Sequence, residues 1–171
     1  GQDMARHHLK VVTEAAKRHI SVNPHEPIKD TGLRRTYPNW ITREGAPGME
    51  YNAWANPPKP PRHEPTLVFT RLLVGPMDYT PGGFGNQTPE TFRDRFLLPT
   101  VMPTRAHGLA MFVVYESPLQ TVADTPDAYA GQPETAFIGQ VPTTWDETRF
   151  IAGEIGRSIV LARRKGRDWY V

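Results

Sequence analysis

The chain has 171 residues, a hydrophobic fraction of 38% and four tryptophans, which suits one ordinary domain with a real core. It contains no cysteine, which excludes a disulfide framework, a thiolate nucleophile and a cysteine-based zinc site. The net charge of only +2 gives little support to nucleic-acid binding, and no run approaches the roughly 18 apolar residues of a membrane helix.

The first predicted element is a helix over residues 4–19, with Asp3 as its N-cap. Its apolar stripe recurs at steps of three and four: Ala5, Leu9, Val12, Ala16 and Ile20. A short strand follows over residues 20–23 and is stopped by Pro24. Helix, strand and then a loop at the strand's carboxyl end is the order of a βα barrel, so we expect His25 and Glu26 where such barrels place their chemistry.

Residues 25–54 predict a long irregular loop that is rich in aromatic and charged side chains. Connections in compact domains have a median of about 4–6 residues, so a loop of this length is more often a site than a spacer. Its three glutamates are Glu26, Glu44 and Glu50, although a single loop glutamate is usually a surface charge or a partner of a nearby arginine. His25 is either a ligand or sugar contact or a structural residue.

The middle of the chain alternates loops with short elements. Residues 56–65 are rich in proline, and a rigid surface spacer is favoured there over a polyproline ligand. A short apolar helix is expected over 66–74, followed by a buried strand end at Asp78. A structural role as a buried acceptor is favoured for Asp78 over a substrate contact. The glycine-rich loop after it lacks a P-loop lysine and a dinucleotide fingerprint.

A further helix is expected over 104–116, a strand over 117–122, and a helix over 127–141 broken by Gly131 and Pro133. These units make three or four strand-loop-helix repeats, whereas a complete barrel needs eight units and about 250 residues. The predicted fold class is therefore α/β, a partial (β/α)8 TIM barrel made of the last three to four βα units. We expect the chain to be a piece of a larger protein.

The pattern changes to β-rich sequence near the end of the chain. Two strands are expected over 150–155 and 158–163, then a turn and a third strand from residue 168, which together predict the start of a small antiparallel β domain. The expected division is 1–145 for the barrel part and 146–171 for the β domain. The basic cluster of Arg163, Arg164, Lys165 and Arg167 is interpreted as a solvated hairpin turn rather than a nucleic-acid site.

Paired carboxylates most often serve the cleavage of glycosidic bonds, where one protonates the leaving oxygen and the other activates water or attacks the anomeric carbon. Sequence spacing does not give the distances between Glu26, Glu44 and Glu50. Three carboxylates in one cleft repel each other and raise at least one pKa, and a hard cation such as calcium relieves that repulsion. Loop aromatics such as Tyr51 and Trp54 offer stacking faces for sugar rings.

Several segments in order, VNPHEPIKDTGLRRTYPN, REGAPGMEYNAW, FTRLLVGPMDYTPGGF, RAHGLAMFVVYESPLQ and WDETRFIAGEIGRSIVLARRKGRDWYV, cover nearly the whole chain. In these segments the sequence resembles glycoside hydrolase family 97, the bacterial α-glucosidase and α-galactosidase family. The resemblance implies an N-terminal β-sandwich, a central barrel and a small C-terminal β domain, of which this chain is the second half of the barrel and the start of the last domain. It also implies a parent protein that is periplasmic or otherwise exported.

By position, the resemblance implies that Glu50 is the general acid and that Glu26 is both general base and calcium ligand. It likewise implies that Glu44 is a second calcium ligand, that His25 contacts the sugar, and that Ca2+ is the cofactor. The expected substrate is an α-linked oligosaccharide, with no nucleic-acid or membrane partner, and the oligomeric state is open.

Glu26 discriminates within the family, because retaining α-galactosidase members resemble HG at this point and place an aspartate nucleophile on an earlier strand. The first hypothesis is therefore an inverting, calcium-dependent α-glucoside hydrolase. The alternatives are a retaining α-galactosidase of the same family and a non-catalytic carbohydrate-binding fragment.

Overall fold

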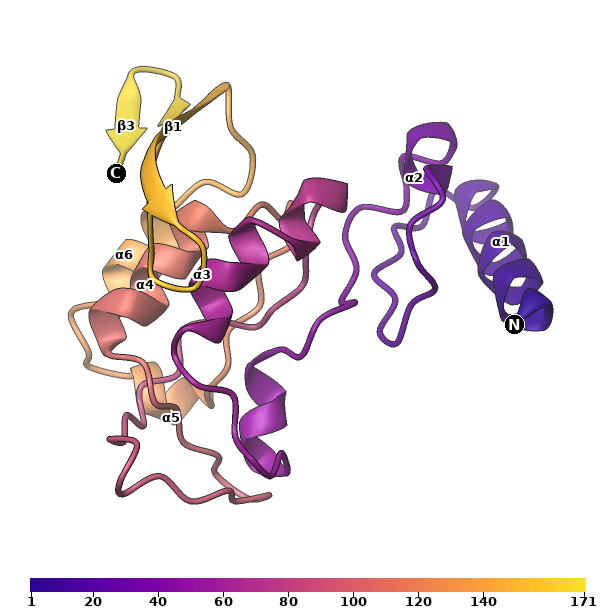
Figure 1. Ribbon diagram of the computed structural model, residues 1–171. Helices are drawn as coiled ribbons and strands as arrows, with labels where there is room; N and C mark the ends of the chain where they lie inside the picture. The colour runs from indigo at the N-terminus through magenta and orange to yellow at the C-terminus, as the bar shows by residue number, and fades with distance from the viewer.

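The computed structural model describes residues 1–171. Its elements in chain order are α1 (Gln2–Ala16), α2 (Leu33–Thr36), the 3-10 helix η1 (Met49–Ala53), α3 (His63–Val68), the 3-10 helix η2 (Arg71–Val74), α4 (Arg105–Val114), α5 (Pro126–Tyr129), α6 (Thr135–Gln140), β1 (Glu147–Glu154), β2 (Ser158–Lys165) and β3 (Asp168–Tyr170). Helices α1 and α2 lie at one end, and the other helices and the sheet form a larger body at the other end (Figure 1). None of the helices is both long and apolar enough to span a membrane.

Helix α1 begins at Gln2, one residue before Asp3, which the sequence predicts as the N-cap. Gly1 is the N-cap, and Asp3 lies inside the first turn, where its carboxylate accepts a hydrogen bond from Arg6 at 2.9 Å. The predicted cap at Asp3 is therefore wrong, although a negative charge in the first turn still suits the helix dipole. The helix ends at Ala16, and His19 follows with a left-handed backbone.

The apolar stripe of α1 is mostly open to solvent. Only Val12 is buried, whereas Leu9 and Ile20 are 40% and 53% exposed. The helix is held to the following loop by His8, whose ring stacks on Trp40 with 5.8 Å between ring centroids. The helix therefore packs against one loop rather than against a layer of strands.

Four extended segments lie side by side; three of them are at or next to expected barrel strands, and the fourth, with Trp40 and Arg43, falls inside the stretch expected to be an irregular loop. Val22 forms a parallel bridge with Trp40, and the Asp78 amide donates to the Arg43 carbonyl at 2.9 Å. The Met77 amide donates to the Glu116 carbonyl, also at 2.9 Å. None of these segments is a regular strand, so the strands expected over 20–23 and 117–122 are reduced to isolated backbone contacts.

Prolines explain why these ladders stay short. Pro24, Pro76 and Pro118 each fall within or beside one of the extended segments and have no N–H to donate to a neighbour. The α/β content agrees with the predicted fold class, but a barrel wall is not shown, and the partial barrel stays a prediction.

The predicted helices are found with shifted bounds. The helix expected over 66–74 is divided into α3 and η2, and the one expected over 104–116 is α4. Helix α4 begins where it does because Thr104 caps it, with its side-chain oxygen accepting from the His107 amide at 3.2 Å. The helix expected over 127–141 is interrupted as predicted, since Gly131 has a φ of 73° and Pro133 follows between α5 and α6.

The predicted hairpin at the end of the chain is confirmed. Strands β1, β2 and β3 form an antiparallel sheet in the order β1-β2-β3, with a register irregularity between Phe150 and Ala152. Gly156 and Gly166 have φ angles of 74° and 59° in the two turns, which is the left-handed region that glycine adopts without strain.

The basic cluster is not wholly solvated, contrary to its interpretation from sequence. Arg163 is buried on β2, and its guanidinium donates to the Val114 carbonyl at the end of α4 at 2.9 Å. Arg164 pairs instead with Glu147 across the sheet at 3.2 Å. Successive side chains of a strand point to opposite faces of the sheet, so every second side chain of β2 faces the helices. Arg163 is one of these side chains and attaches the sheet to α4.

A hydrophobic cluster sits between the helices and the extended segments. Its buried members are Met49, Leu67, Met77, Tyr79, Val101, Met111 and Tyr115. The rings of Tyr79 and Tyr115 meet edge to face with centroids 5.1 Å apart, and their hydroxyls donate to Glu64, one to its carboxylate and one to its carbonyl.

Glu64 is a carboxyl group inside this core. It is 3% exposed, and burial raises its pKa to about 7, although the hydrogen bond from Tyr79 acts in the opposite direction. Its Oε2 atom has no hydrogen-bond partner. The Glu64 carboxyl of the folded chain therefore keeps its proton at a pH at which the same carboxyl of the unfolded chain has released it.

We predict that the free energy of unfolding of the wild-type chain falls between about pH 4.5 and 7, and that Glu64→Gln abolishes this fall. In that interval the unfolded state binds fewer protons than the folded state, so the free energy of unfolding falls as pH rises, by about 2–3 kcal/mol from this group. Urea unfolding of both chains at a series of pH values measures the difference. Parallel pH profiles would contradict the prediction.

Candidate active site

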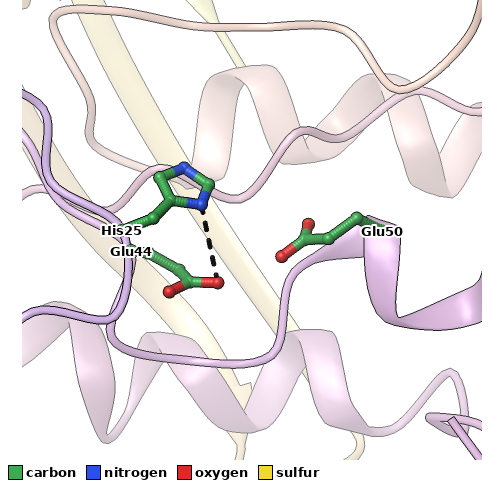
Figure 2. Close-up of side chains that lie close together, drawn as sticks. All are labelled: His25, Glu44 and Glu50. Atoms are coloured by element: carbon green, nitrogen blue, oxygen red, sulfur yellow. Dashed lines mark ion pairs between the residues drawn. The ribbon is translucent and has the colours of Figure 1, made fainter. Parts of the chain in front are cut away.

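Three of the chemically active side chains from the loop region 25–54 meet in one place. His25, Glu44 and Glu50 each offer a ligand atom, and these atoms lie within 4.8 Å of one another. Figure 2 shows Glu50 facing the other two residues from its own 3-10 helix. The long loop therefore folds back and brings residues that are distant in the sequence together.

The site lies at the carboxyl ends of the extended segments. His25 follows the segment that bridges at Val22, and Glu44 follows the one that bridges at Trp40. Glu50 is in the first turn of η1. Glu44 is buried, Glu50 is partly buried, and the side chain of His25 is 49% exposed, so the group opens toward solvent on the histidine side.

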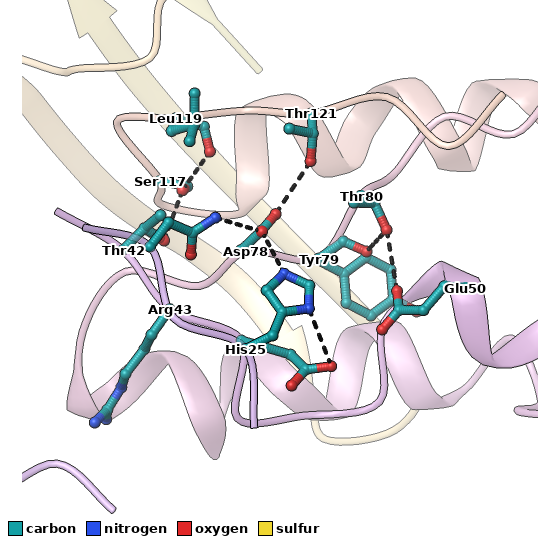
Figure 3. A network of polar contacts seen from close by, with 12 residues as sticks. His25, Thr42, Arg43, Glu50, Asp78, Tyr79, Thr80, Ser117, Leu119 and Thr121 are labelled. Atoms are coloured by element: carbon teal, nitrogen blue, oxygen red, sulfur yellow. Dashed lines mark hydrogen bonds and ion pairs between the residues drawn. The ribbon is translucent and has the colours of Figure 1, made fainter. Parts of the chain in front are cut away.

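Asp78 anchors the His25 ring through a direct side-chain contact. Its Oδ2 atom accepts from the side-chain amide (Nδ2) of Asn23 at 2.7 Å and lies 2.9 Å from Nε2 of His25, while Oδ1 accepts from the Thr121 hydroxyl at 3.1 Å (Figure 3). Asp78 is only 5% exposed, so these three partners satisfy a carboxylate that water does not reach freely. The geometry supports the structural role that was favoured for Asp78.

The acids around His25 act on its titration. Burial alone lowers the pKa of the imidazole, but the hydrogen bond to Asp78 and the charges of Glu44, Asp78 and Glu50 together outweigh it and raise the pKa. Nδ1 of His25 lies 3.7 Å from Oε1 of Glu44. Protonated His25 would therefore carry the one positive charge next to three carboxylates.

Glu50 has the environment of a proton donor. Burial raises the pKa of its carboxyl, and the neighbouring Glu44 raises it further, while its own backbone and Thr80 act in the opposite direction. The Thr80 hydroxyl lies 3.3 Å from Oε2 of Glu50. A general acid needs a raised pKa so that it still holds its proton at working pH.

Gly48 makes room for this carboxyl. A Cβ atom at position 48 would lie 2.5 Å from Oε2 of Glu50 and 2.9 Å from the Tyr79 carbonyl oxygen. Only glycine fits this close approach. Gly48 and Thr80 were not singled out from the sequence, and the only available signal was their position next to Glu50 and Asp78.

Glu26 does not join the group with its carboxylate. The side chain is exposed, and the contact with the site is made by the backbone amide, which donates to Oε2 of Glu44 at 2.8 Å. The charge of Glu26 nevertheless acts on Tyr51 in the same loop. Burial raises the pKa of the Tyr51 hydroxyl, and the charges of Glu44, Glu50 and Glu26 raise it further. The catalytic and metal-binding roles of Glu26 stay predictions.

Arg71 fixes the backbone that carries Glu44. Its guanidinium donates to the carbonyls of Arg43 and Glu44 on one segment, and to those of Gly75 and Pro76 on the next. Burial lowers the pKa of this guanidinium to about 10. The positive charge is directed at carbonyl oxygens, so it does not neutralise the carboxylates of the site.

Calcium sites are built mainly from oxygen ligands. Calcium takes six to eight oxygen ligands, and the two carboxylates of Glu44 and Glu50 fit that preference, whereas the imidazole of His25 does not. When His25 is neutral, the two crowded carboxylates have no cationic partner among these three residues, and such a pair suits a hard cation.

Comparisons with known proteins agree at both ends of the chain. The profile described as glycoside hydrolase 97 matches residues 1–46, and the one described as glycosyl-hydrolase 97 C-terminal, oligomerisation, matches residues 144–171. Solved structures of a glycoside hydrolase family 97 enzyme from Pseudoalteromonas sp. strain K8, in complex with panose and with acarbose, superpose with a TM-score of 0.85 at 48% identity. They cover 99% of this chain and 26% of that enzyme.

The chain belongs to glycoside hydrolase family 97. Among curated family 97 relatives, a retaining alpha-galactosidase of Bacteroides thetaiotaomicron is 38% identical over 99% of this chain and 26% of its own length. A probable retaining alpha-galactosidase of Streptomyces bingchenggensis is 36% identical over 99% of the chain and 25% of its length. The chain thus spans about a quarter of the family 97 relatives that it matches.

We predict that Asp78→Asn lowers the pKa of His25, because it removes a negative charge and a charge-assisted hydrogen bond that favour the imidazolium. Titration of the histidine ring signals by NMR measures the shift. The signal of His107, whose pKa is lowered by burial alone, serves as the internal control. An unchanged His25 titration would show that Asp78 does not support the charged ring.

Proposed function

We propose that the chain is the later part of the catalytic barrel, residues 1–145, and the start of the C-terminal β domain, residues 146–171, of an inverting, calcium-dependent α-glucoside hydrolase. The single observation that carries this proposal is the partly buried Glu50, with its raised pKa, opposite His25 and Glu44. The parallel backbone contacts between the extended segments support a barrel origin, since active sites of such barrels lie at the carboxyl ends of the strands.

In the proposed reaction Glu50 donates its proton to the glycosidic oxygen as the bond to the anomeric carbon breaks. Glu26 takes a proton from the water that attacks the opposite face of the sugar, so the configuration is inverted. Thr80 donates a hydrogen bond to the Glu50 carboxyl, and Gly48 leaves the space that this carboxyl occupies. His25, anchored by Asp78, is exposed enough to contact the sugar bound at the point of cleavage.

The backbone of Glu26 supports a functional reason for this side chain. Its φ is 48°, in the left-handed region that costs a non-glycine residue about 1–2 kcal/mol. Glycine, which retaining family members are expected to carry here, would adopt this conformation without strain. A glutamate kept at a position that suits glycine is consistent with a need for its carboxylate.

The preference for glucosides has support from relatives. The Pseudoalteromonas enzyme, whose solved structures hold panose and acarbose, is 48% identical to this chain. The two α-galactosidases are 38% and 36% identical to this chain. Panose is a glucose trisaccharide with α-glucosidic bonds.

A retaining α-galactosidase is the second candidate. The two curated relatives carry that name, and the exposed carboxylate of Glu26 lies outside the group formed by His25, Glu44 and Glu50. In that case a carboxylate outside this chain would attack the sugar, and Glu50 would still act as the acid.

Calcium would be held by Glu44 and, in the proposal, by Glu26, and when bound it would supply positive charge that offsets the crowded carboxylates. The backbone amide of Glu26 already donates to Glu44, so the two residues are coupled through the main chain.

We expect the full-length protein that carries this chain to release the β-anomer first from an α-glucoside. Proton NMR of the sugar formed in the first minutes of hydrolysis measures this. An initial α-anomer, or hydrolysis of α-galactosides alone, would replace the proposal with the second candidate. Binding of maltotriose without any turnover would favour a non-catalytic role.

Two variants separate the acid from the base in this experiment. Glu50→Gln is expected to lower kcat by at least about a hundredfold, the usual contribution of general acid-base catalysis. Glu26→Gly is expected to lose turnover while the free energy of unfolding stays equal or rises, because the left-handed backbone is relieved. Full activity of Glu26→Gly would exclude Glu26 as the base.

Removal of calcium is expected to reduce turnover of the full-length protein, and added Ca2+ is expected to restore it. Glu44→Gln should weaken calcium binding, measured by isothermal titration calorimetry, because it removes a buried carboxylate. Glu90→Gln, in an exposed loop, is the matched control. Equal calcium affinity in the wild type and Glu44→Gln would refute this role.

A further inference from the structure

A cavity of about 200 Å³ lies between α3, α4 and the turn that joins β1 to β2. Figure 1 shows this turn in front of the two helices. Glu64 of α3, His107 of α4 and Arg157 of the turn line the cavity, and neither Glu50 nor His25 does. It is therefore a separate space from the candidate active site. A cavity of roughly 150 Å³ is enough for benzene, so a small organic molecule fits here.

Glu64 brings an acceptor without a partner to this cavity. It is 3% exposed, its Oε1 accepts from the Tyr79 hydroxyl at 2.9 Å, and its Oε2 has no hydrogen bond. Buried polar atoms are nearly always paired, with the protein, with water or with a ligand. The Tyr115 hydroxyl also lines the cavity but is already used, because it donates to the Glu64 carbonyl at 3.0 Å. A donor for Oε2 therefore has to come from outside the chain.

His107 offers a second acceptor from the neighbouring helix. Burial lowers the pKa of its imidazole, so the ring is neutral at pH 7 and keeps an unprotonated nitrogen that accepts hydrogen bonds. Arg157 does not balance these acceptors, since its ion pair is with Glu154 at 2.7 Å and its side chain is 74% exposed. The cavity thus combines acceptors from α3 and α4 with a cationic side chain that stays at the surface.

Most of the remaining wall is apolar. Its members include Val68 of α3, Met111 and Val114 of α4, and Ile159 of β2. A ligand that matches both parts of the cavity carries several N–H donors at one end and a hydrocarbon body at the other. A primary ammonium group fits the polar end, because it has no acceptor of its own and its charge strengthens each hydrogen bond to a carboxylate.

We infer that this cavity binds a small aliphatic primary amine. The ammonium group donates to Glu64 and His107, and the alkyl chain packs among the apolar side chains of the wall. No covalent bond of the amine is made or broken. This binding does not depend on the proposed hydrolysis, because neither Glu50 nor Glu26 takes part in it.

Binding is expected to release a proton below about pH 7. Burial raises the pKa of Glu64 to about 7, and a protonated Glu64 has to lose its proton to solvent when the ammonium pairs with the carboxylate. The neighbouring hydroxyls of Tyr79 and Tyr115 stay neutral, because burial raises their pKa values well above the usual range. The ring of His107 is neutral above its lowered pKa. Glu64 is therefore the group around the ammonium that titrates.

The test compares three ligands of equal chain length by isothermal titration calorimetry of the full-length protein at pH 7. n-Hexylamine should bind about tenfold more tightly than hexan-1-ol, because a hydrogen bond between charged groups contributes more than a neutral one. Equal affinities for the amine and the alcohol would mean that the cavity only takes up apolar chains and would overturn the inference. Tighter binding of hexanoate would overturn it too, since Arg157 would then select the ligand.

Glu64→Gln keeps the size of the side chain and removes its charge. It should lower the affinity for n-hexylamine about tenfold and leave that for hexan-1-ol unchanged. It should also abolish the proton release, which titrations at about pH 6.5 in buffers of different ionisation enthalpy measure. Glu134→Gln is the matched control, because Oε2 of Glu134 is also buried without a partner but Glu134 lies outside this cavity and pairs with Arg105 at 3.4 Å.

A second variant fills the cavity instead of changing its charge. Ala110 lines the cavity from an exposed position on α4, so Ala110→Phe should fold and weaken the binding of amine and alcohol alike. Circular dichroism checks that each variant is folded. Wild-type affinity for n-hexylamine in both Glu64→Gln and Ala110→Phe would place the amine elsewhere, for example on the carboxylates of Glu44 and Glu50, and the inference would be wrong.

Discussion

A buried carboxylate with no arginine or lysine beside it imposes the strongest constraint on this structure. Asp78 is nearly inaccessible to water, so its two oxygens must be satisfied by hydrogen bonds from the protein. The donors are Asn23 and His25, more than forty residues before Asp78 in the sequence, and Thr121, more than forty residues after it. Satisfying one acid therefore brings three extended segments together and orients the histidine that faces the other acids.

Elements with a local signal could be predicted from the sequence. The hairpin is specified by turn glycines and alternating side chains, and α4 by its cap at Thr104 and its apolar period. The barrel strands could not be resolved in the same way, because prolines interrupt their ladders and pairing between distant segments is not a local property. The burial of Arg163 was missed for a related reason, since a run of basic residues looks solvated until the sheet meets α4.

For the site, composition selected the loop 25–54 and its three glutamates as candidates, and the structure brings two of them, Glu44 and Glu50, together with His25. The direction of each carboxylate was beyond sequence reasoning. The left-handed backbone at Glu26 turns its side chain outward and its amide toward Glu44, and no residue pattern reveals that choice in advance. Gly48 was equally hidden, because its importance depends on the exact approach of Glu50.

The guanidinium of Arg71 has a consequence for how such a site tolerates sequence change. All of its acceptors are main-chain carbonyls, so it recognises the path of two segments and not the identity of their side chains. Exposed residues of the proline-rich run between those segments, such as Asn56, Pro57 and Pro60, make none of these contacts, so their side chains can change while Glu44 keeps its place. One arginine thereby keeps an acid in place through contacts that do not depend on the side chains around it, so the position of Glu44 tolerates sequence change in the exposed part of that loop.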